Sequence, residues 1–275
     1  MAVGIVGLLD RRLLHRRRLA TELKTAISSG SLRLAFEPIV SLVTFEVVAF
    51  EAVLDWERAD GHIALPDELT EVAEETGLAV AMGRSLIEEG CRQLARWNDV
   101  EPDRPPLTMA VPVSTRLVMA DGFARHVGDV VDRRSVDPEY LVLEIRETAW
   151  NRPTVTQLEA VRRLGVRIAL DGYGTGAATL AGVASLPIDA LKIDGGFVAD
   201  LGVLTNDTTV IRAFVTLGHA LGLFVVAEGV DTDAQLAMLH MVGCDLAQGS
   251  YFARPMSATR AADIVRDRTM HMPGV

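Results

Sequence analysis

The sequence predicts an α/β protein folded as a (β/α)8 barrel in which the first strand runs antiparallel to the second. Three observations predict this fold. Eight short apolar runs of β type occur in the 275 residues, helix-period segments separate most of them, and acidic residues stand where several runs end. An open, doubly wound sheet produces the same alternation and is the alternative fold.

Residues 1–18 are predicted to form a basic arm before the barrel. Five arginines, among them Arg11 and Arg16, lie beside leucines such as Leu8 in this arm. We interpret it as a solvated helix that leads into the domain, with a membrane-surface or partner-binding helix as the alternative. No linker rich in Pro, Gly or Ser follows, so residues 19–267 are assigned to one barrel domain and residues 268–275 to a C-terminal tail.

The predicted strands are short runs rich in Val, Ile, Leu and Ala. They cover Leu32–Ile39, Val47–Leu54, Thr108–Val113, Tyr140–Ile145, Arg167–Asp171, Ala190–Ile193, Phe224–Ala227 and Leu246–Gln248. Only the short turn Ser41–Phe45 separates the first two runs, which indicates an antiparallel hairpin.

The predicted helices fill most of the other intervals, where apolar residues recur with the helical period. They cover residues 66–77, 83–98, 115–131, 154–164, 205–221 and 232–241. Eight strands with interleaved helices in roughly 250 residues is the strand count of a barrel.

The composition excludes several classes of protein. Lys and Arg number 27 and Asp and Glu number 37, a formal net charge of −10 that argues against general nucleic-acid binding. No apolar stretch reaches the roughly 18 residues of a transmembrane segment, and no secretory signal is recognised because arginines follow the apolar run Gly4–Leu9. The distant cysteines Cys91 and Cys244 are interpreted as free thiols in a reducing cytosol, so a cytoplasmic protein is expected. The six histidines do not pair at metal-ligand spacing, which argues against a zinc site.

Charged and polar side chains stand at or just beyond the carboxyl ends of consecutive predicted strands. They are Glu51, Glu144, Glu147, Asp171, Lys192, Asp194, Glu228, Asp231 and Gln248. In a barrel these ends converge on one face, where two like charges 4 Å apart cost roughly 4 kcal/mol at an effective dielectric of about 20. Such a cluster needs cations or protons, and its oxygen ligands suit Mg²⁺, Mn²⁺ or Ca²⁺, which can activate a water and polarise a phosphoryl oxygen. Lys192 is one of only two lysines in the chain, and a compact ammonium among these acids could orient that water.

A glycine-rich segment offers a competing interpretation. Residues 172–177, GYGTGA, fit the pattern of a dinucleotide-binding turn, and Asp194 follows near the position of a ribose-binding acid. Asp171 directly precedes the turn, however, and would repel a pyrophosphate. A lone glycine fingerprint is also a weak signal, so the dehydrogenase interpretation ranks low.

Seven segments carry motif-like sequences in a fixed order. They are FEPI at 36–39, EAVLDW at 51–56, LEIRE at 143–147, LDGYGTG at 170–176, LKID at 191–194, AEGVD at 227–231 and QG at 248–249. They resemble YQPI, EALLRW, LEITE, LDDFGTG, LKID, AEGVE and QG of the EAL domain, the bacterial family that hydrolyses cyclic di-GMP to linear pGpG. The resemblance runs from about Leu19 to Pro255 and implies a (β/α)8 TIM-like barrel with an antiparallel first strand.

The resemblance also implies roles for the matching positions. The metal ligands, for Mg²⁺ or Mn²⁺ in an active enzyme, would be Glu51, Glu144, Asp171 and Glu228. The catalytic positions would be Lys192, Glu147 and Asp231, and the positions that contact the ligand would be Gln248, Asp194, Pro38, Glu37 and Asp55.

Four positions depart from the family pattern in ways that matter chemically. Pro112 stands where the family has a metal-binding asparagine, and proline has no side-chain oxygen. Gly172 replaces the second aspartate of DDFG and removes another ligand. Asp55 replaces the phosphate-contacting arginine of EALLRW, and Glu37 replaces the glutamine of YQPI, so both changes add negative charge toward an anionic ligand.

These departures lead to three hypotheses. The leading one is a degenerate EAL domain with little or no phosphodiesterase activity, a regulatory or protein-interaction role and no required cofactor. The second is an active metal-dependent phosphodiesterase, and the third is a non-catalytic cyclic di-GMP receptor whose binding Asp55 and Glu37 would weaken. We also expect a homodimer formed near the loop Gly172–Leu180 and an unidentified protein partner. Asp231 stands at the second glutamate of AEGVE, and although its side chain is one carbon shorter it keeps the negative charge.

Overall fold

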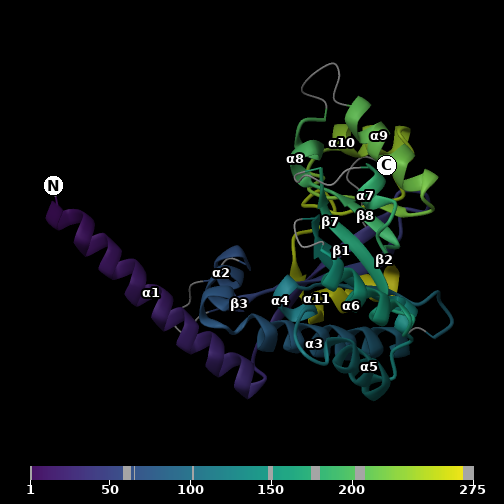
Figure 1. Cartoon of the computed structure of the whole chain (residues 1–275). Helices are drawn as coiled ribbons and strands as arrows, with labels where there is room; N and C mark the ends of the chain where they lie inside the picture. The colour runs from purple at the N-terminus through teal and green to yellow at the C-terminus, as the bar shows by residue number, and fades with distance from the viewer. Residues whose placement is uncertain are drawn as a thin grey trace.

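The computed structural model describes residues 2–57, 63–64, 66–100, 102–147, 151–174, 180–201 and 208–268. All but the first residue of the predicted C-terminal tail, and residues 175–179 of the predicted dimer loop, therefore lie outside the described residues. Figure 1 shows the barrel with its helices and a long N-terminal helix that runs out from it.

Eight strands form a closed barrel. In chain order they are β1 (Leu34–Ser41), β2 (Val47–Leu54), β5 (Thr108–Pro112), β6 (Leu141–Arg146), β7 (Arg167–Tyr173), β8 (Ala190–Ile193), β9 (Phe224–Ala227) and β10 (Leu246–Ala247). Neighbours from β2 round to β10 pair in parallel, and β10 pairs with β1 to close the ring. The predicted barrel is confirmed, and the open sheet is wrong because its two edge strands pair with each other.

The first strand runs antiparallel to both of its barrel neighbours. Leu34 pairs with Leu54 and Glu37 with Glu51 across the β1–β2 hairpin, as the short turn predicted. A short strand that the sequence reading missed, β11 (Met256–Ser257), adds to β1 beside this hairpin. The small hairpin of β3 (Trp56–Glu57) and β4 (Ile63–Ala64) was also missed.

The helices pack around the barrel. They are α2 (Pro66–Thr76), α3 (Ala79–Val100), α4 (Thr115–Val118), α5 (Phe123–Arg134), α6 (Arg152–Arg162), α7 (Leu180–Val183), α8 (Gly195–Ala199), α9 (Thr208–Ala220), α10 (Asp233–Met241) and α11 (Ala258–Asp267), with a 3₁₀ turn at Pro138–Tyr140. The single helix predicted over 115–131 is wrong. Gly122 adopts a left-handed φ of 72° at the start of α5, which separates it from α4.

Helix α1 (Ala2–Ser29) continues through the boundary that the sequence placed between arm and barrel. Its C-terminal half is anchored, because Leu19 and Leu23 are fully buried. Arg16 forms an ion pair with Glu75 of α2 at 2.7 Å, so one arginine of the basic run connects α1 to the rest of the domain. Among the helices that the structure describes, none combines the length and apolar character needed to cross a membrane.

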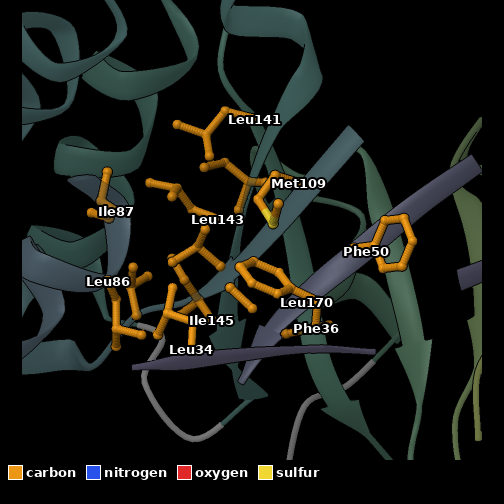
Figure 2. Packing of buried hydrophobic residues seen from close by; sticks show 14 of the residues in the cluster. Leu34, Phe36, Phe50, Leu86, Ile87, Met109, Leu141, Leu143, Ile145 and Leu170 are labelled. Atoms are coloured by element: carbon orange, nitrogen blue, oxygen red, sulfur yellow. The ribbon is translucent and has the colours of Figure 1, made fainter. Parts of the chain in front are cut away.

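Most apolar side chains are buried between the outer face of the barrel and its helices. Figure 2 shows this layer, in which Leu143 and Ile145 of β6 lie near Leu86 and Ile87 of α3. Trp97 of α3 packs its ring against the rings of two strand phenylalanines, with centroids 4.9 Å from Phe36 and 4.7 Å from Phe50. These contacts hold α3 against the hairpin that presents Glu37 and Glu51.

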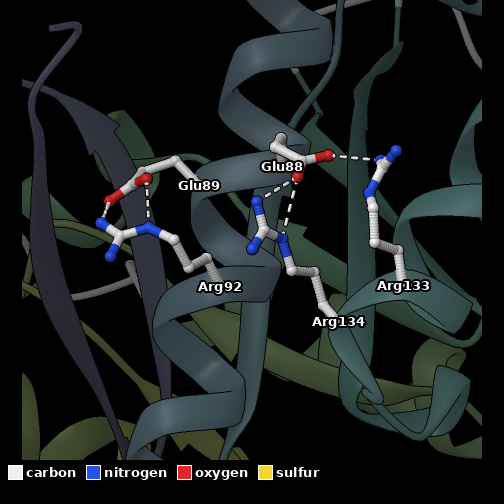
Figure 3. A network of polar contacts seen from close by, with 5 residues as sticks. All are labelled: Glu88, Glu89, Arg92, Arg133 and Arg134. Carbon is white, nitrogen blue, oxygen red and sulfur yellow. Dashed lines mark hydrogen bonds and ion pairs between the residues drawn. The ribbon is translucent and has the colours of Figure 1, made fainter. Parts of the chain in front are cut away.

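An ion-pair network on α3 ties the neighbouring helix to it (Figure 3). Glu88 accepts from Arg133 at 2.7 Å and from Arg134 Nε at 2.8 Å, and both arginines lie in the last turn of α5. On the same helix Arg92 donates to Glu89 at 2.7 Å. The contacts of Glu88 join α3 to α5, whereas the contact between Arg92 and Glu89 lies within one turn of α3.

Candidate functional site

The alternation of side chains along each strand places the site. Successive residues of a strand point to opposite faces, so Glu144 points into the barrel while its neighbours Leu143 and Ile145 pack outward against the helices. The same period brings Glu51 of β2 and Lys192 of β8 to the inner face, and Glu228, the residue after β9, joins them there. The barrel gathers these side chains toward the carboxyl ends of its parallel strands, as the sequence predicted.

Lys192 lies at the centre of this cluster. Its Nζ is 2.9 Å from Glu51 Oε2, 2.8 Å from Glu144 Oε1 and 2.7 Å from Glu228 Oε1. The side chains of Lys192 and Glu144 are each 2% exposed. One buried ammonium therefore neutralises part of the charge of three carboxylates, and all three of its N–H donors have an acceptor.

The cluster shifts the pKa of each of its members. Burial alone would lower the pKa of Lys192, but the surrounding carboxylates, Glu144 above all, raise it well above its ordinary value. Burial and the negative charge of Glu51 raise the pKa of Glu144, and burial likewise raises that of Glu228. The pKa of Glu51 is lowered, because Lys192 and a hydrogen bond from Gln248 outweigh the effect of burial.

Glu37 and Gln248 complete the inner face around Glu51. Gln248 Nε2 donates to Glu51 Oε2 at 2.7 Å, and Gln248 Oε1 is a buried acceptor with no hydrogen-bond partner among the described residues. Glu37 faces Glu51 in the β1–β2 register. Burial and the charge of Glu51 raise the pKa of Glu37 to about 7, so this carboxyl group titrates near neutral pH.

A cleft opens above the cluster at the mouth of the barrel. It consists of two cavities of about 340 and 430 Å³ that share Glu51, Arg146 and Asp171 in their walls. The smaller extends toward α2 and α3, where Leu54, Met82 and Leu86 make its wall largely apolar. Glu147, Asp171, Gly172, Asp194 and Glu228 line the larger cavity, which is strongly acidic.

Pro112 lies in the wall of this cleft, beside Glu144 in the β5–β6 register. Its ring presents only carbon atoms to the space that it lines. Gly172 adopts a left-handed φ of 69° where the β7–β8 register shifts, and it too offers no side-chain oxygen. Two of the substituted positions therefore lie in the cleft itself.

The remaining predicted site residues differ in their placement. Asp194 caps α8 by accepting from Gly196 N at 2.8 Å, and Glu147 accepts from Gly174 N at 3.0 Å, which ties it to the loop after β7. Asp231 is hydrogen-bonded by the Ser250 hydroxyl, and its negative charge helps to raise the pKa of Glu37.

The last two predicted ligand contacts lie on or beside the β1–β2 hairpin. Asp55 directly follows β2, and its N–H donates to Arg33 O at 3.2 Å. Pro38 lies on the face of β1 opposite Glu37, since neighbouring side chains alternate, and it is buried there.

The sequence reading missed Arg146. It follows Glu144 by two residues on β6, lines both cavities, and holds its Nε 3.9 Å from Asp171 Oδ2. Its spacing from Glu144 is the signal that could have found it, because residues i and i+2 of a strand share a face. Arg146 is a cation in the wall of an otherwise acidic cleft.

The carboxylates do not form a ready metal site. Within the part of the chain that the structure describes, no group of three or more His, Cys, Asp or Glu is arranged to hold a metal ion. Glu51, Glu144 and Glu228 each direct an oxygen at Lys192 instead. In this arrangement the carboxylates do not fit Mg²⁺ or Mn²⁺.

The comparison with protein families decides what this barrel is. A family model described as the EAL domain matches residues 20–255. The chain belongs to the EAL domain family. The resemblance carried by the seven motifs is thereby confirmed over nearly the whole chain.

Relatives of this EAL domain occur in several bacteria. It is 34% identical over 244 residues to the bifunctional diguanylate cyclase/cyclic di-GMP phosphodiesterase MucR of Pseudomonas aeruginosa, a match that covers 88% of this chain and 35% of MucR. It is 32% identical over 248 residues to the uncharacterized protein Rv1357c of Mycobacterium tuberculosis, covering 88% of this chain and 80% of that protein. The chain thus spans about a third of MucR but most of the mycobacterial relative.

A solved structure matches the EAL domain closely. The PaMucR phosphodiesterase in its c-di-GMP complex superposes with a TM-score of 0.82 at 34% identity, covering 89% of this chain and 99% of that one. This match confirms the (β/α)8 TIM-like fold, with its antiparallel first strand, that the sequence predicted.

Proposed function

We propose that this EAL domain takes part in cyclic di-GMP signalling in the cytoplasm, has little or no phosphodiesterase activity, and acts through contacts with other proteins. Membership in the family and the likeness to the PaMucR complex support the signalling context. The single observation that carries the loss of activity is Pro112, a side chain without oxygen in the wall of the cleft beside Glu144. Loss of one oxygen ligand lowers metal affinity directly, whereas even changes that act through a neighbouring residue cost about 10–100-fold.

The charge of the cleft supports the same proposal. Five carboxylates, including Asp171 and Asp194, line its larger cavity, and Arg146 is the one cation among the described residues of that wall. The phosphodiester groups of cyclic di-GMP are anions, so they meet repulsion there unless a metal ion offsets it. Weak capture of the ligand is therefore expected together with weak hydrolysis.

The alternative function is metal-dependent hydrolysis of cyclic di-GMP to linear pGpG. It is favoured by one observation, that Glu51, Glu144 and Asp171 still line one cleft next to Lys192. In that case Mg²⁺ or Mn²⁺ would have to draw the carboxylates away from the ammonium. A non-catalytic receptor is the third function, and it requires binding that survives Asp55 and Glu37.

The deciding experiment incubates the purified chain with cyclic di-GMP and either Mg²⁺ or Mn²⁺ and follows linear pGpG by chromatography over hours. The wild-type chain should give no product above that of Glu51→Gln. Product that disappears in Glu51→Gln would overturn the proposal and establish the enzyme. Binding of labelled cyclic di-GMP, measured in parallel without turnover, would instead establish the receptor.

A restored variant tests the reasoning from the opposite direction. Pro112→Asn and Gly172→Asp return the two lost ligands, and Asp55→Arg with Glu37→Gln returns the two ligand contacts. We expect the fourfold variant to gain metal-dependent hydrolysis at least tenfold above wild type. A folded fourfold variant without activity would show that these positions are not what limits turnover. Light scattering of the wild-type chain tests the proposed homodimer.

A further inference from the structure

The barrel interior is hollow below the candidate site. The inward-facing positions near the amino ends of the parallel strands hold Ala49, Ala110, Ala169 and Ala190. Bulky branched residues usually dominate the interior layers of such barrels and fill them. Four alanines therefore leave space that side chains occupy in other barrels of this size.

This space is a cavity of about 330 Å³, which we name the basal cavity. Its walls are mostly apolar and include Ile39, Val142, Val226 and Leu246. Glu144 and Lys192 also line it, so the layer that carries the candidate site separates the basal cavity from the cleft at the mouth. An eight-stranded barrel is wide enough to hold one small ligand, and pockets for small molecules begin at about 300 Å³.

The charged groups around the basal cavity already have partners. Arg167 at the rim donates to Glu139 at 2.8 Å, while Asp189 accepts from Arg162 at 2.6 Å and from the Ile168 N–H at 2.9 Å. In the inner wall Lys192 Nζ forms an ion pair with Glu144 Oε1 at 2.8 Å. A charged ligand would lose its hydration without gaining a new partner, whereas an uncharged apolar ligand loses nothing.

An exposed aromatic ring extends the apolar surface at the opening. Phe224 is the first residue of β9, lines the basal cavity, and is 57% exposed. Large apolar side chains at this level of exposure add contact area for a ligand that fills the cavity and reaches its rim. From these observations we propose that the basal cavity binds one small, uncharged, apolar molecule. This site is separate from the cleft, and it stands whether or not the domain hydrolyses cyclic di-GMP.

The test titrates the full chain with N-phenyl-1-naphthylamine, an uncharged apolar dye whose fluorescence rises when it leaves water. Wild type should show saturable binding of one dye per chain. Ala190→Leu fills the cavity and should weaken binding at least tenfold, whereas Ala213→Leu adds the same atoms on the exposed face of α9 and should leave it unchanged. Absence of saturable binding by the folded wild type, or equal binding by Ala190→Leu, would overturn the proposal.

Two further measurements sharpen this test. If Ala190→Leu does not fold, Ala190→Val adds less volume and should still weaken binding severalfold. Displacement of the dye by 1-octanol should need at least tenfold lower concentrations than displacement by octanoate, which has the same chain length and a charge. Equal displacement by the two would refute the preference for an uncharged ligand.

Discussion

Replacing Lys192 with methionine would remove the ammonium that lies within 3 Å of three inward-facing glutamates. The side chains of Glu51, Glu144 and Glu228 are 15%, 2% and 21% exposed, so water replaces little of the lost stabilisation. Removing one partner of a buried ion pair costs roughly 3–5 kcal/mol, because it leaves charge without compensation. We expect Lys192→Met to lose that much unfolding free energy at pH 8.

The loss must depend on pH in a defined direction. The pKa of Lys192 is raised in the folded state, so its contribution is fully present below its ordinary value of 10.5 and stays constant between pH 5 and 8. Without the ammonium, the pKa values of Glu144 and Glu228 rise further, and the pKa of Glu51, which Lys192 helps to lower in the wild type, rises as well. When the pKa of a group is higher in the folded state than in the unfolded state, the unfolding free energy decreases as the pH rises. The decrease is up to about 1.4 kcal/mol per pH unit for each proton that only the folded state binds. The difference between wild type and variant should therefore widen from pH 5 to pH 8.

Urea unfolding at pH 5 and pH 8 measures both effects. The control is Lys24→Met, which removes the other lysine of the chain from an exposed position on α1 and should change stability by less than about 0.5 kcal/mol. A loss below about 1 kcal/mol for Lys192→Met at pH 8, or equal losses at the two pH values, would refute the account of a buried ammonium that holds three carboxylates.

Three other changes test separate features. Glu37→Gln removes a carboxyl group whose pKa rises from 4.5 to about 7 on folding, so the wild type loses up to about 3 kcal/mol of unfolding free energy as the pH rises through that interval. Urea unfolding should therefore show the variant to be more stable than the wild type at pH 8, with most of that difference gone at pH 5. Gly249→Ala would bring a Cβ within 2.3 Å of the Val230 nitrogen at a φ of +149°. This variant should lose about 3 kcal/mol of unfolding free energy, measured by thermal unfolding, whereas Gly222→Ala, where the space is open, should lose about 1 kcal/mol. Equal losses for the two variants would show that the added Cβ does not clash with Val230. Glu88→Gln breaks the ion pairs to α5 and should cost about 1 kcal/mol at low salt and less in 1 M NaCl, and a loss that salt leaves unchanged would argue against an ion-pair origin.

The sequence predicted the strands better than the helices, for a physical reason. Apolar runs bounded by polar residues fixed β2, β8 and β9 to the residue, because each is short and ends where its buried face ends. The helical period continues across the break between α4 and α5, so it could not reveal that Gly122 turns the chain there. The antiparallel hairpin was predictable since a turn of a few residues cannot carry a parallel crossover.

The site was predictable as a set but not as an arrangement. Acids at successive strand ends indicated that Glu51, Glu144 and Glu228 would meet, and they do. The alternation that brings them inward also sends Pro38 outward and brings Arg146 in, which motif matching overlooked. That Lys192 would stand between all three glutamates depends on barrel closure, a long-range property that no local pattern encodes.

The antiparallel first strand has a consequence for how the protein is made. β1 can pair with β2 as soon as both have left the ribosome, but its other neighbours, β10 and β11, begin at residues 246 and 256. The edge of β1 therefore stays open during synthesis of some two hundred residues, with apolar strands exposed to other chains. The ring cannot close until β10 and β11 have emerged, so the emergence of residues 246–257, more than any earlier step, should decide between a native barrel and aggregation.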